Sequence, residues 1–219
     1  DFGGSSSKLT LIDTSGRAVW ENAVEYPTYY PRKGWCEQKP EDWERALIDN
    51  VRKLFEVKKI NPSEILAIAV DSATHTNVLC DENFVPLRPA IFWTDSRSAR
   101  QVQKLKKEYG QLIFEQCYHA PDTIWTLPQL LWVKENEPEN FKKLRYIFFE
   151  KDYIRFRLTG TYCTDYIEAQ GSMLFDCGKN KWSGDLLRIA EIKEEMLPKV
   201  VKPTDIIGKV TCAAAKRTG

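Results

Sequence analysis

The sequence predicts an α/β domain, because strand-like and helix-like hydrophobic patterns are interspersed along it. Residues 7–13 alternate apolar and polar side chains, which is typical of a strand with one buried face. Residues 65–70 form a short continuous apolar run, which predicts a strand buried on both faces. From Trp43 to Phe55, apolar residues recur at helical spacing and mark one face of a helix.

The first half of the chain combines a predicted hairpin with that predicted helix. Residues 15–17 form a turn, and residues 18–26 return beside residues 7–13 as the second strand. The helix begins at Pro40, since proline is favoured in the first helical turn. The Asn-Pro pair at 61–62 breaks it.

Beyond the apolar run at 65–70, we expect extended segments at 77–80 and 85–93. A charged helix follows over residues 95–109, and Gly110 ends it. The second half of the chain is mainly helical. Its helices are expected at 126–135, 138–144, 151–158 and 184–192, and its strands at 145–149 and 208–211.

Composition and charge argue against several classes of protein. With 219 residues, of which 42% are hydrophobic, the chain can bury the core of one large domain. The 32 basic and 31 acidic residues are intermixed and leave a net charge of +1, which does not favour nucleic-acid binding. No apolar run approaches the length that spans a bilayer, and no secretory signal is apparent.

The six cysteines are scattered and include no C-x-x-C pair. None has a ligand-like spacing to His75 or His119, which argues against a zinc site. We therefore expect reduced thiols in a cytosolic protein.

The chain opens with DFGGSSSKLTLID, a stretch with the chemistry of a phosphate-binding loop. Glycine N–H groups can approach phosphate oxygens, and hydroxyl groups and a lysine supply further donors. Asp1 can hold Mg²⁺ against the β- and γ-phosphates, directly or through water. The stretch lacks the G-x-x-x-x-G-K-[ST] pattern of a Walker A loop. A flexible terminus rich in glycine and serine is the alternative interpretation.

A polar cluster at residues 71–76 follows the apolar run, at a place where open α/β sheets commonly carry ligand sites. Thr74 and His75 can both form hydrogen bonds with a hydroxyl group of a ligand. The alternative is a histidine held within the hydrogen-bond network of a loop.

A second cluster, WTDSR at residues 93–97, places Asp95 and Arg97 beside an apolar tryptophan, which suits recognition of a polyol. The alternative is a helix N-terminus capped by Thr94 or Asp95. We interpret the basic residues of this region as a solvated helix face rather than a nucleic-acid site. They are Arg97, Arg100, Lys104, Lys106 and Lys107.

Several blocks of the sequence, in order, resemble those of the FGGY family of carbohydrate kinases. Residues 1–13 resemble the opening D-x-G-T-[ST]-S-x-[KR] hairpin of that family, and residues 34–43 its G-W-x-E-Q-x-P-E-D-W block. Residues 86–97 are similar to P-L-x-P-A-I-x-W-x-D-x-R, and residues 127–139 to the A-P-K-L-L-W-x-x-x-N-E-P-E helix. The stretches KDYIRFRLTG, TDY and LPKVV…IGKVT complete the series, which is most similar to the xylulokinase branch.

The resemblance implies a ribonuclease-H-like, actin-type ATPase domain with a mixed sheet and flanking helices. It also implies transfer of the γ-phosphoryl group of ATP to a sugar hydroxyl, with ATP and Mg²⁺ as cofactors. It places Asp1 near Mg²⁺ as a catalytic residue, and Thr74 and His75 on the sugar. The residues that would border the phosphates are Gly3, Gly4, Ser5, Ser6 and Lys8. Those that would line or support the sugar pocket are Asp95, Arg97 and Trp125.

On this resemblance, residues 1–219 are the N-terminal sugar-binding domain of a kinase, truncated at both ends. The family's catalytic aspartate, the general base, is expected beyond residue 219, and so is the adenine-binding domain. The chain alone is therefore expected to be inactive. The expected partners are a small-molecule sugar, ATP and the C-terminal kinase domain, with no nucleic acid and no membrane. A homodimer is kept as a candidate assembly.

Three substitutions leave the sugar open. Asp71 replaces a small residue and is similar to ribulokinase-type sequences, Thr74 replaces the methionine of xylulokinases, and Gln129 replaces a lysine. A ketopentose such as D-xylulose is favoured, with ribulose, gluconate or another polyol as alternatives. Two other classes stay open: a metal-dependent ribonuclease-H-like nuclease that uses Asp1 and Asp71, and a non-catalytic sugar-binding domain.

Overall fold

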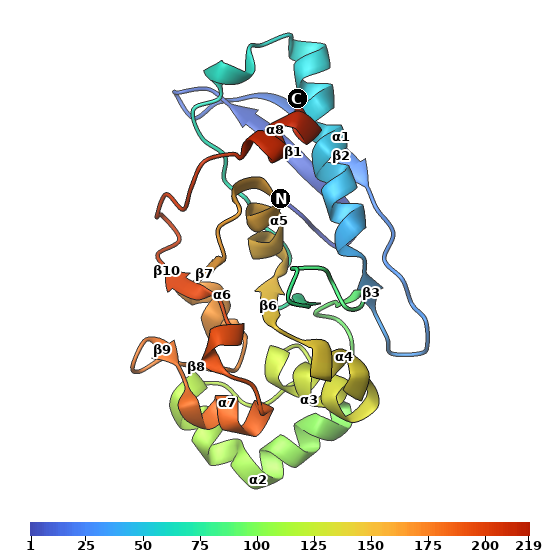
Figure 1. The fold of residues 1–219 in the computed structure, drawn as a ribbon, viewed down its shortest axis with the longest axis vertical. Helices are drawn as coiled ribbons and strands as arrows, with labels where there is room; N and C mark the ends of the chain where they lie inside the picture. The colour runs from blue at the N-terminus through green and yellow to red at the C-terminus, as the bar shows by residue number, and fades with distance from the viewer.

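The computed structural model describes residues 1–219, in which helices and strands alternate along the chain (Figure 1). The strands are β1 (Ser6–Ile12), β2 (Ala18–Glu25), β3 (Glu37–Gln38), β4 (Asn77–Cys80), β5 (Ala90–Ile91), β6 (Tyr146–Phe149), β7 (Cys163–Asp165), β8 (Phe175–Asp176), β9 (Lys181–Trp182) and β10 (Lys199–Val201). The helices are α1 (Pro40–Lys58), α2 (Ala99–Cys117), α3 (Thr126–Asn136), α4 (Pro138–Lys143), α5 (Glu150–Thr159), α6 (Tyr166–Gly171), α7 (Gly184–Ala190) and α8 (Cys212–Thr218), with short 3-10 helices η1 (Pro62–Glu64) and η2 (Glu194–Met196). The predicted α/β class is confirmed, and no helix is both long and apolar enough to cross a membrane.

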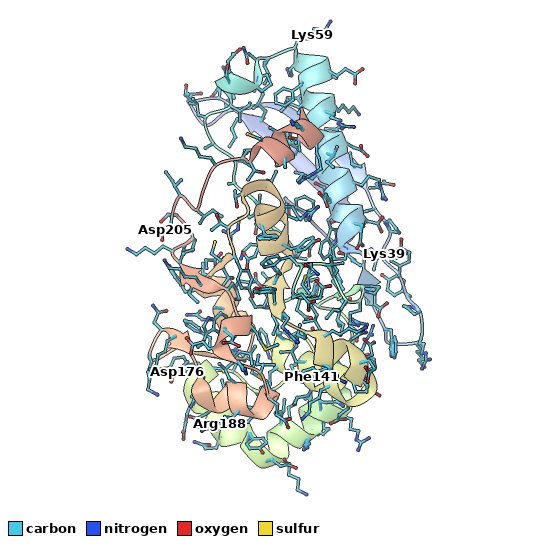
Figure 2. All side chains as sticks on the ribbon, viewed as in Figure 1. Lys39, Lys59, Phe141, Asp176, Arg188 and Asp205 are labelled. Carbon is cyan, nitrogen blue, oxygen red and sulfur yellow. The ribbon has the colours of Figure 1, made fainter.

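The molecule is elongated, with β1, β2 and α1 towards one end and a mainly helical lobe at the other (Figure 1). Helices α2, α3, α4 and α7 gather in that lobe, while β6 and α5 lie between the two ends. Figure 2 shows Lys39 and Lys59 at opposite ends of α1. A buried cluster of 22 apolar residues fills the helical lobe, and a second cluster of 10 joins α1, β4, β6 and α5.

The predicted hairpin is confirmed, since β1 and β2 pair antiparallel along their whole length. Helix α1 begins at Pro40 as predicted and buries Trp43 and Ala46 completely. Asn50 of α1 is also fully buried, and its Nδ2 donates to the carbonyl and hydroxyl oxygens of Ser7 at 2.9 and 3.2 Å. This pair of hydrogen bonds joins the helix to the first strand of the hairpin.

The strand pairs are both parallel and antiparallel, which agrees with the predicted mixed arrangement. Strands β3, β5, β4 and β6 form a four-stranded antiparallel sheet in that order. Strands β7 and β10 pair parallel. The extended segment predicted at residues 77–80 corresponds to β4, and all four of its residues are buried. The helices predicted for the second half correspond to α3, α4, α5 and α7, and the strand predicted at 145–149 corresponds to β6.

The strand predicted at residues 65–70 is wrong. These residues carry no strand pairing, and Leu66 and Ile68 are 83% and 56% exposed. Parallel pairing starts only after the segment, where Phe2 forms a bridge with Ser72. A strand needs a neighbour for its N–H and C=O groups. No strand within residues 1–219 runs beside 65–70, and of its large apolar side chains Leu66 and Ile68 are exposed while Ile65 and Val70 are half-buried.

The predicted end of the charged helix is also wrong, because α2 runs from Ala99 to Cys117 and contains Gly110 in its interior. A Cβ atom at Gly110 would meet nothing within 4 Å, so this glycine is not required by packing. Beyond it, Ile113 and Cys117 are buried in the helical lobe. Their burial offsets the poor helix propensity of one glycine, and the helix ends at Cys117, followed by Tyr118 with a left-handed φ of 61°.

Two extended segments are shorter than predicted or absent. Of residues 85–93, only β5 is a strand, because Pro86 and Pro89 supply no N–H group for a ladder. Residues 208–211 form no strand. Thr211 instead caps α8, since its side chain accepts the N–H of Ala214 at 3.2 Å.

Candidate functional site

A cavity of about 390 Å³ lies where the end of α2, the start of α3 and helix α6 meet. A volume of this order suits a small molecule. Apolar, aromatic and uncharged polar groups make up its wall, and no Asp, Glu, Lys or Arg contributes to it. The lining residues are His75, Cys117, Tyr118, His119, Trp125, Ile167, Gln170, Gly171 and Cys177.

Trp125 is held at this cavity by both histidines of the chain. His75 packs against its indole at a centroid distance of 4.7 Å and an interplanar angle of 69°, and His119 stacks on it at 4.1 Å and 25°. The indole N–H donates to the carbonyl of Ala120 at 3.1 Å. With its N–H already used, the indole offers the cavity an apolar aromatic face, the usual complement to the C–H face of a sugar.

His75 sits in a left-handed backbone conformation, with φ at 62°. Residues other than glycine rarely adopt this conformation, and they do so mainly where the surrounding structure imposes it. The N–H of His75 donates to Oε1 of Glu168 in α6 at 2.8 Å. The Nδ1 atom of the ring is buried on the side of Gly171 and has no hydrogen-bond partner in the protein.

Both imidazoles are neutral near pH 7. Burial, and to a smaller extent the neighbouring His119, lowers the pKa of His75 to about 4. Burial also lowers the pKa of His119, against the raising effect of its hydrogen bond to the carbonyl of Gln170. A neutral imidazole both donates and accepts, which matches the hydrogen bonding of a hydroxyl group.

Thr74 and Asp71 lie outside the cavity wall. Thr74 precedes His75 but is exposed, and Asp71 is exposed with Oδ1 accepting the N–H of Ser72 at 2.9 Å. Of the residues predicted to contact the sugar, the cavity therefore contains His75 and Trp125, whereas Thr74 stands at the surface beside them.

The opening stretch folds as a tight hairpin loop that leads into β1. Phe2 pairs with Ser7, and the carbonyl groups of the loop point into the protein: that of Gly3 accepts the hydroxyl of Tyr26, and that of Gly4 accepts Nε2 of Gln38. The backbone N–H groups of Gly4 and Ser5 have no backbone partner. Backbone N–H groups that are left free in a glycine-rich loop can bind an anion.

Lys8 does not point its charge at this loop in the structure. Its ammonium group pairs with Glu21 across the hairpin at 3.2 Å, where both side chains are about half exposed. An exposed pair of this kind contributes little to stability. Gly3, Gly4, Ser5 and Ser6 thus lie together at one turn, with Lys8 on the adjoining strand.

Asp1, which is predicted to be a Mg²⁺ ligand, has a carboxylate that could take this role. The residue is exposed beside the loop, and its backbone pairs with Lys8 in both directions, at 3.0 and 2.8 Å. A free carboxylate near open amide groups is the donor set that Mg²⁺ uses together with phosphate oxygens. No group of three or more metal-ligating side chains occurs in the structure, so water and phosphate oxygens would have to complete the shell.

The hairpin loop and the cavity are joined by one short segment. Phe2 pairs with residues 71–73 through hydrogen bonds of 2.9 and 2.7 Å, and His75 follows Ser72 by three residues. Since an extended chain advances at most about 3.6 Å per residue, His75 lies within about 11 Å of the paired strand. The two predicted half-sites therefore share one stretch of backbone.

Asp95 and Arg97 are not at the cavity, which corrects the expectation that Arg97 belongs to a solvated helix face. Asp95 is 1% exposed, accepts the N–H of Cys36 at 2.5 Å and pairs with Arg97 at 2.8 Å. Arg97 also pairs with Glu37 at 2.7 Å, and its guanidinium group lies 3.9 Å from the ring centre of Trp35. The two side chains form a buried ion pair in the loop before α2, and Arg97 joins this loop to Glu37 of β3. The four basic residues of α2 itself, Arg100, Lys104, Lys106 and Lys107, are exposed.

Sequence reasoning missed several members of the site. His119 follows α2 and was considered only as a zinc ligand, although its place in a loop before Trp125 favours an aromatic pair. Glu168 and Gly171 lie in α6, a helix that the sequence analysis did not predict. The signal for α6 is its cap, because Asp165 accepts the N–H groups of Ile167 and Glu168.

Comparison with known proteins agrees with this arrangement. The profile described as the FGGY family of carbohydrate kinases, N-terminal domain, matches residues 1–219. The chain belongs to this family. The xylulose kinase of Bacillus subtilis is 32% identical over 219 residues, which are 100% of this chain and 44% of that protein. The glycerol kinase of Thermococcus onnurineus is 32% identical over 212 residues, which are 95% of this chain and 43% of that protein.

Solved structures of FGGY kinases confirm the fold. The ligand-bound xylulose kinase of Lactobacillus acidophilus superposes with a TM-score of 0.93 at 29% identity and covers 100% of this chain and 44% of its own. The gluconate kinase of Lactobacillus acidophilus gives the same TM-score of 0.93 at 29% identity, and covers 99% of this chain and 44% of its own. The expected ribonuclease-H-like, actin-type fold is thereby confirmed. This FGGY chain spans less than half the length of the relatives that it matches.

Proposed function

We propose that the full-length protein transfers the γ-phosphoryl group of ATP to a hydroxyl group of an uncharged sugar, with a ketopentose such as D-xylulose as the preferred class. The observation that carries this proposal is a cavity whose wall contains Trp125 and two neutral imidazoles. One short segment of backbone joins this cavity to a loop in which the N–H groups of Gly4 and Ser5 have no backbone partner. Membership of the FGGY family supports it.

The chemistry of the cavity favours a neutral polyol over a sugar acid. A carboxylate would need a cation or several charge-assisted donors, and burying it without them is costly. The wall provides neither Lys nor Arg, and burial keeps His75 and His119 uncharged near neutral pH. We therefore rank xylulose, ribulose and glycerol above gluconate.

Phosphoryl transfer requires in-line positioning and neutralisation of the charge on the γ-phosphate. In our proposal the N–H groups of Gly4 and Ser5 hold phosphate oxygens, and Lys8 leaves Glu21 to pair with them. Asp1 would hold Mg²⁺, which supplies positive charge against the phosphates when it is bound. His75 and Trp125 orient the sugar so that one hydroxyl faces the hairpin loop.

The general base is proposed to come from outside these 219 residues. No carboxylate lines the cavity, and a general base must lie within hydrogen-bond reach of the hydroxyl that it deprotonates. We propose that a C-terminal kinase domain supplies this base and the adenine pocket, in keeping with the share of the relatives that this chain covers. We also propose a cytoplasmic location, in which the six cysteines, none of which forms a disulfide in the structure, would be reduced.

Isothermal titration of the full-length protein against xylulose, ribulose, glycerol and gluconate tests this proposal, together with a coupled assay for ADP release. We expect saturable binding and turnover with at least one uncharged sugar, and none with gluconate. Binding of gluconate alone would overturn the proposed substrate class. Failure of all four compounds to bind or turn over would overturn sugar phosphorylation itself.

A further inference from the structure

We propose that Glu168 and Gly171 are positioning residues for the sugar site, because together they form a socket on α6 that turns the imidazole of His75 into the cavity. The inference rests on the proposed function, since it assigns to these residues the placement of a sugar ligand. Both residues touch His75 from a distant part of the sequence.

The need for a socket follows from the conformation of His75. Its φ of 62° costs free energy that an unsupported loop would release by relaxing to a common conformation. Its side chain is 20% exposed and its Nδ1 atom has no partner, so the ring itself gains little from hydrogen bonding. The restraint must therefore come from contacts made by neighbouring residues.

Glu168 supplies the first restraint. Its Oε1 atom accepts the backbone N–H of His75 at 2.8 Å, a bond between residues 93 positions apart. The same oxygen lies 3.9 Å from Nδ1 of the ring. Because the carboxylate is almost fully buried, losing it would leave the N–H of His75 without a partner in a dry environment.

Glu168 is itself held rigidly. Its backbone N–H donates to the Asp165 cap at 3.1 Å, and its Oε2 atom lies 3.5 Å from Nζ of Lys151. Lys151 also pairs with Asp165 at 2.9 Å and with Asp152 at 3.3 Å. The buried ammonium group thus ties α5 to α6 and keeps the carboxylate of Glu168 pointing at His75.

Gly171 makes the second contribution, because its missing side chain leaves room for the imidazole of His75. A Cβ atom at this position would lie 2.1 Å from Cε1 and 2.2 Å from Nδ1 of His75, closer than any real contact. Its own backbone conformation does not require glycine, since its φ is not in the left-handed region. The absent side chain is therefore explained by the imidazole that fills its place, and Gly171 also lines the cavity.

The test compares Gly171→Ala, Glu168→Ala and Glu168→Gln in the full-length protein, with Gly110→Ala and Glu108→Ala as matched controls. Gly110 lies inside a helix with open space around it, and Glu108 is exposed on the same helix. The first readout is the NMR signal of the His75 ring, which Trp125 shifts by its ring current and which a His75→Asn variant assigns. The second readout is the dissociation constant of xylulose beside that of ATP.

We expect Gly171→Ala to move the His75 signal and to weaken xylulose binding at least about tenfold, with ATP binding unchanged. Glu168→Ala should weaken xylulose binding roughly tenfold, because an unpaired buried N–H costs on the order of that factor. Glu168→Gln should restore most of the affinity, since its amide oxygen still accepts the N–H. Unchanged His75 signals in both alanine variants would overturn the socket, whether or not the wild type binds xylulose.

A double-mutant cycle covers the case in which Gly171→Ala is too unstable to assay. If the clash is with the imidazole, Gly171→Ala should cost little stability in a His75→Ala background, where the ring is absent. An equal loss of melting temperature in both backgrounds would show that His75 is not what Gly171 accommodates. Lack of xylulose binding by the wild type would instead count against the proposed function alone.

Discussion

The imidazole of His119 stacks on the indole of Trp125, with ring centroids 4.1 Å apart and planes inclined by 25°. His75 contacts the same indole from a different part of the chain, at 4.7 Å. The loop after α2 and the segment before β4 therefore fix one aromatic side chain between them. An aromatic wall that is ordered before a ligand arrives lowers the entropic cost of binding.

Trp125→Ala should weaken sugar binding about tenfold, because it removes the aromatic wall and frees both imidazoles. Trp125→Phe should cost less, since a ring remains for the stacking contact. Isothermal titration with the best sugar measures both variants. Trp20→Ala is a suitable control, because Trp20 lies in β2 and does not line the cavity. Equal affinities of Trp125→Ala and wild type would remove Trp125 from the binding site.

Asp1→Asn should lower the turnover number at least about a hundredfold, the order of loss seen when one group that stabilises transition-state charge is removed. The Mg²⁺ concentration for half-maximal activity should rise as well, since a neutral amide is a poorer ligand for this ion. The melting temperature should not change, because Asp1 is exposed. Asp49→Asn, another exposed aspartate, is the control. Unaltered Mg²⁺ dependence would contradict the assignment.

Sugar affinity should be constant from about pH 8 to about pH 5.5, because the pKa of His75 is lowered to about 4, mainly by burial and then by His119. A titration of affinity centred near the ordinary histidine value of 6.5 would contradict this. His119, whose pKa is also lowered by burial, and the carboxyl of Glu168, whose pKa is raised by burial, are the other titratable groups that face His75.

The same lowered pKa predicts how stability depends on pH. The unfolded chain binds a proton at His75 near pH 6.5, whereas the folded protein does so only near pH 4. This contribution to stability is therefore complete above pH 6.5 and is lost as the pH falls towards 4. Thermal melts across this range should show a smaller loss for His75→Asn than for the wild type. Parallel curves would show that His75 titrates normally.

Arg97→Ala should destabilise the protein by about 3–5 kcal/mol, because it leaves the buried carboxylate of Asp95 without a cation, although Glu37 still pairs with Arg88. Denaturant unfolding measures the free energy. Arg100→Ala should change it by less than about 0.5 kcal/mol, since Arg100 is exposed. At a temperature where Arg97→Ala stays folded, its sugar affinity should equal that of the wild type. A specific loss of affinity would return Arg97 to the sugar site.

The parts of the fold that could be predicted from sequence are those whose signal is local. The alternation in 7–13 predicts β1, and Pro40 with the apolar face of Trp43 and Ala46 predicts α1, because each element buries the face that its own periodicity defines. Residues 65–70 failed for the opposite reason. An apolar run indicates that a segment is buried, but strand pairing also requires a neighbouring strand, and the sequence of the segment does not show whether one is present.

The residues of the candidate site likewise fall into those that a local sequence signal or the family resemblance predicts and those that depend on distant contacts. His75 was predicted from the polar cluster that follows an apolar run, and Trp125 only from the family resemblance. Glu168 and Gly171 were not found, because their contacts with His75 join residues about a hundred positions apart and depend on the approach of α6. The prediction for Arg97 was wrong because a run of basic residues has the same sequence pattern whether its first member is solvated or buried. The burial of Arg97 depends on its ion pair with Glu37, which is distant in the sequence.

The open stretch at residues 65–70 has a consequence for handling the isolated chain. Extended, apolar and without strand partners, it offers its backbone to any other molecule that carries a similar stretch. Two such stretches would pair their backbone N–H and C=O groups with each other. Concentrated solutions would then form soluble aggregates at temperatures below the melting temperature of the fold. A single lysine at Leu66 or Ile68, both largely exposed, would hinder that contact at no cost to the core.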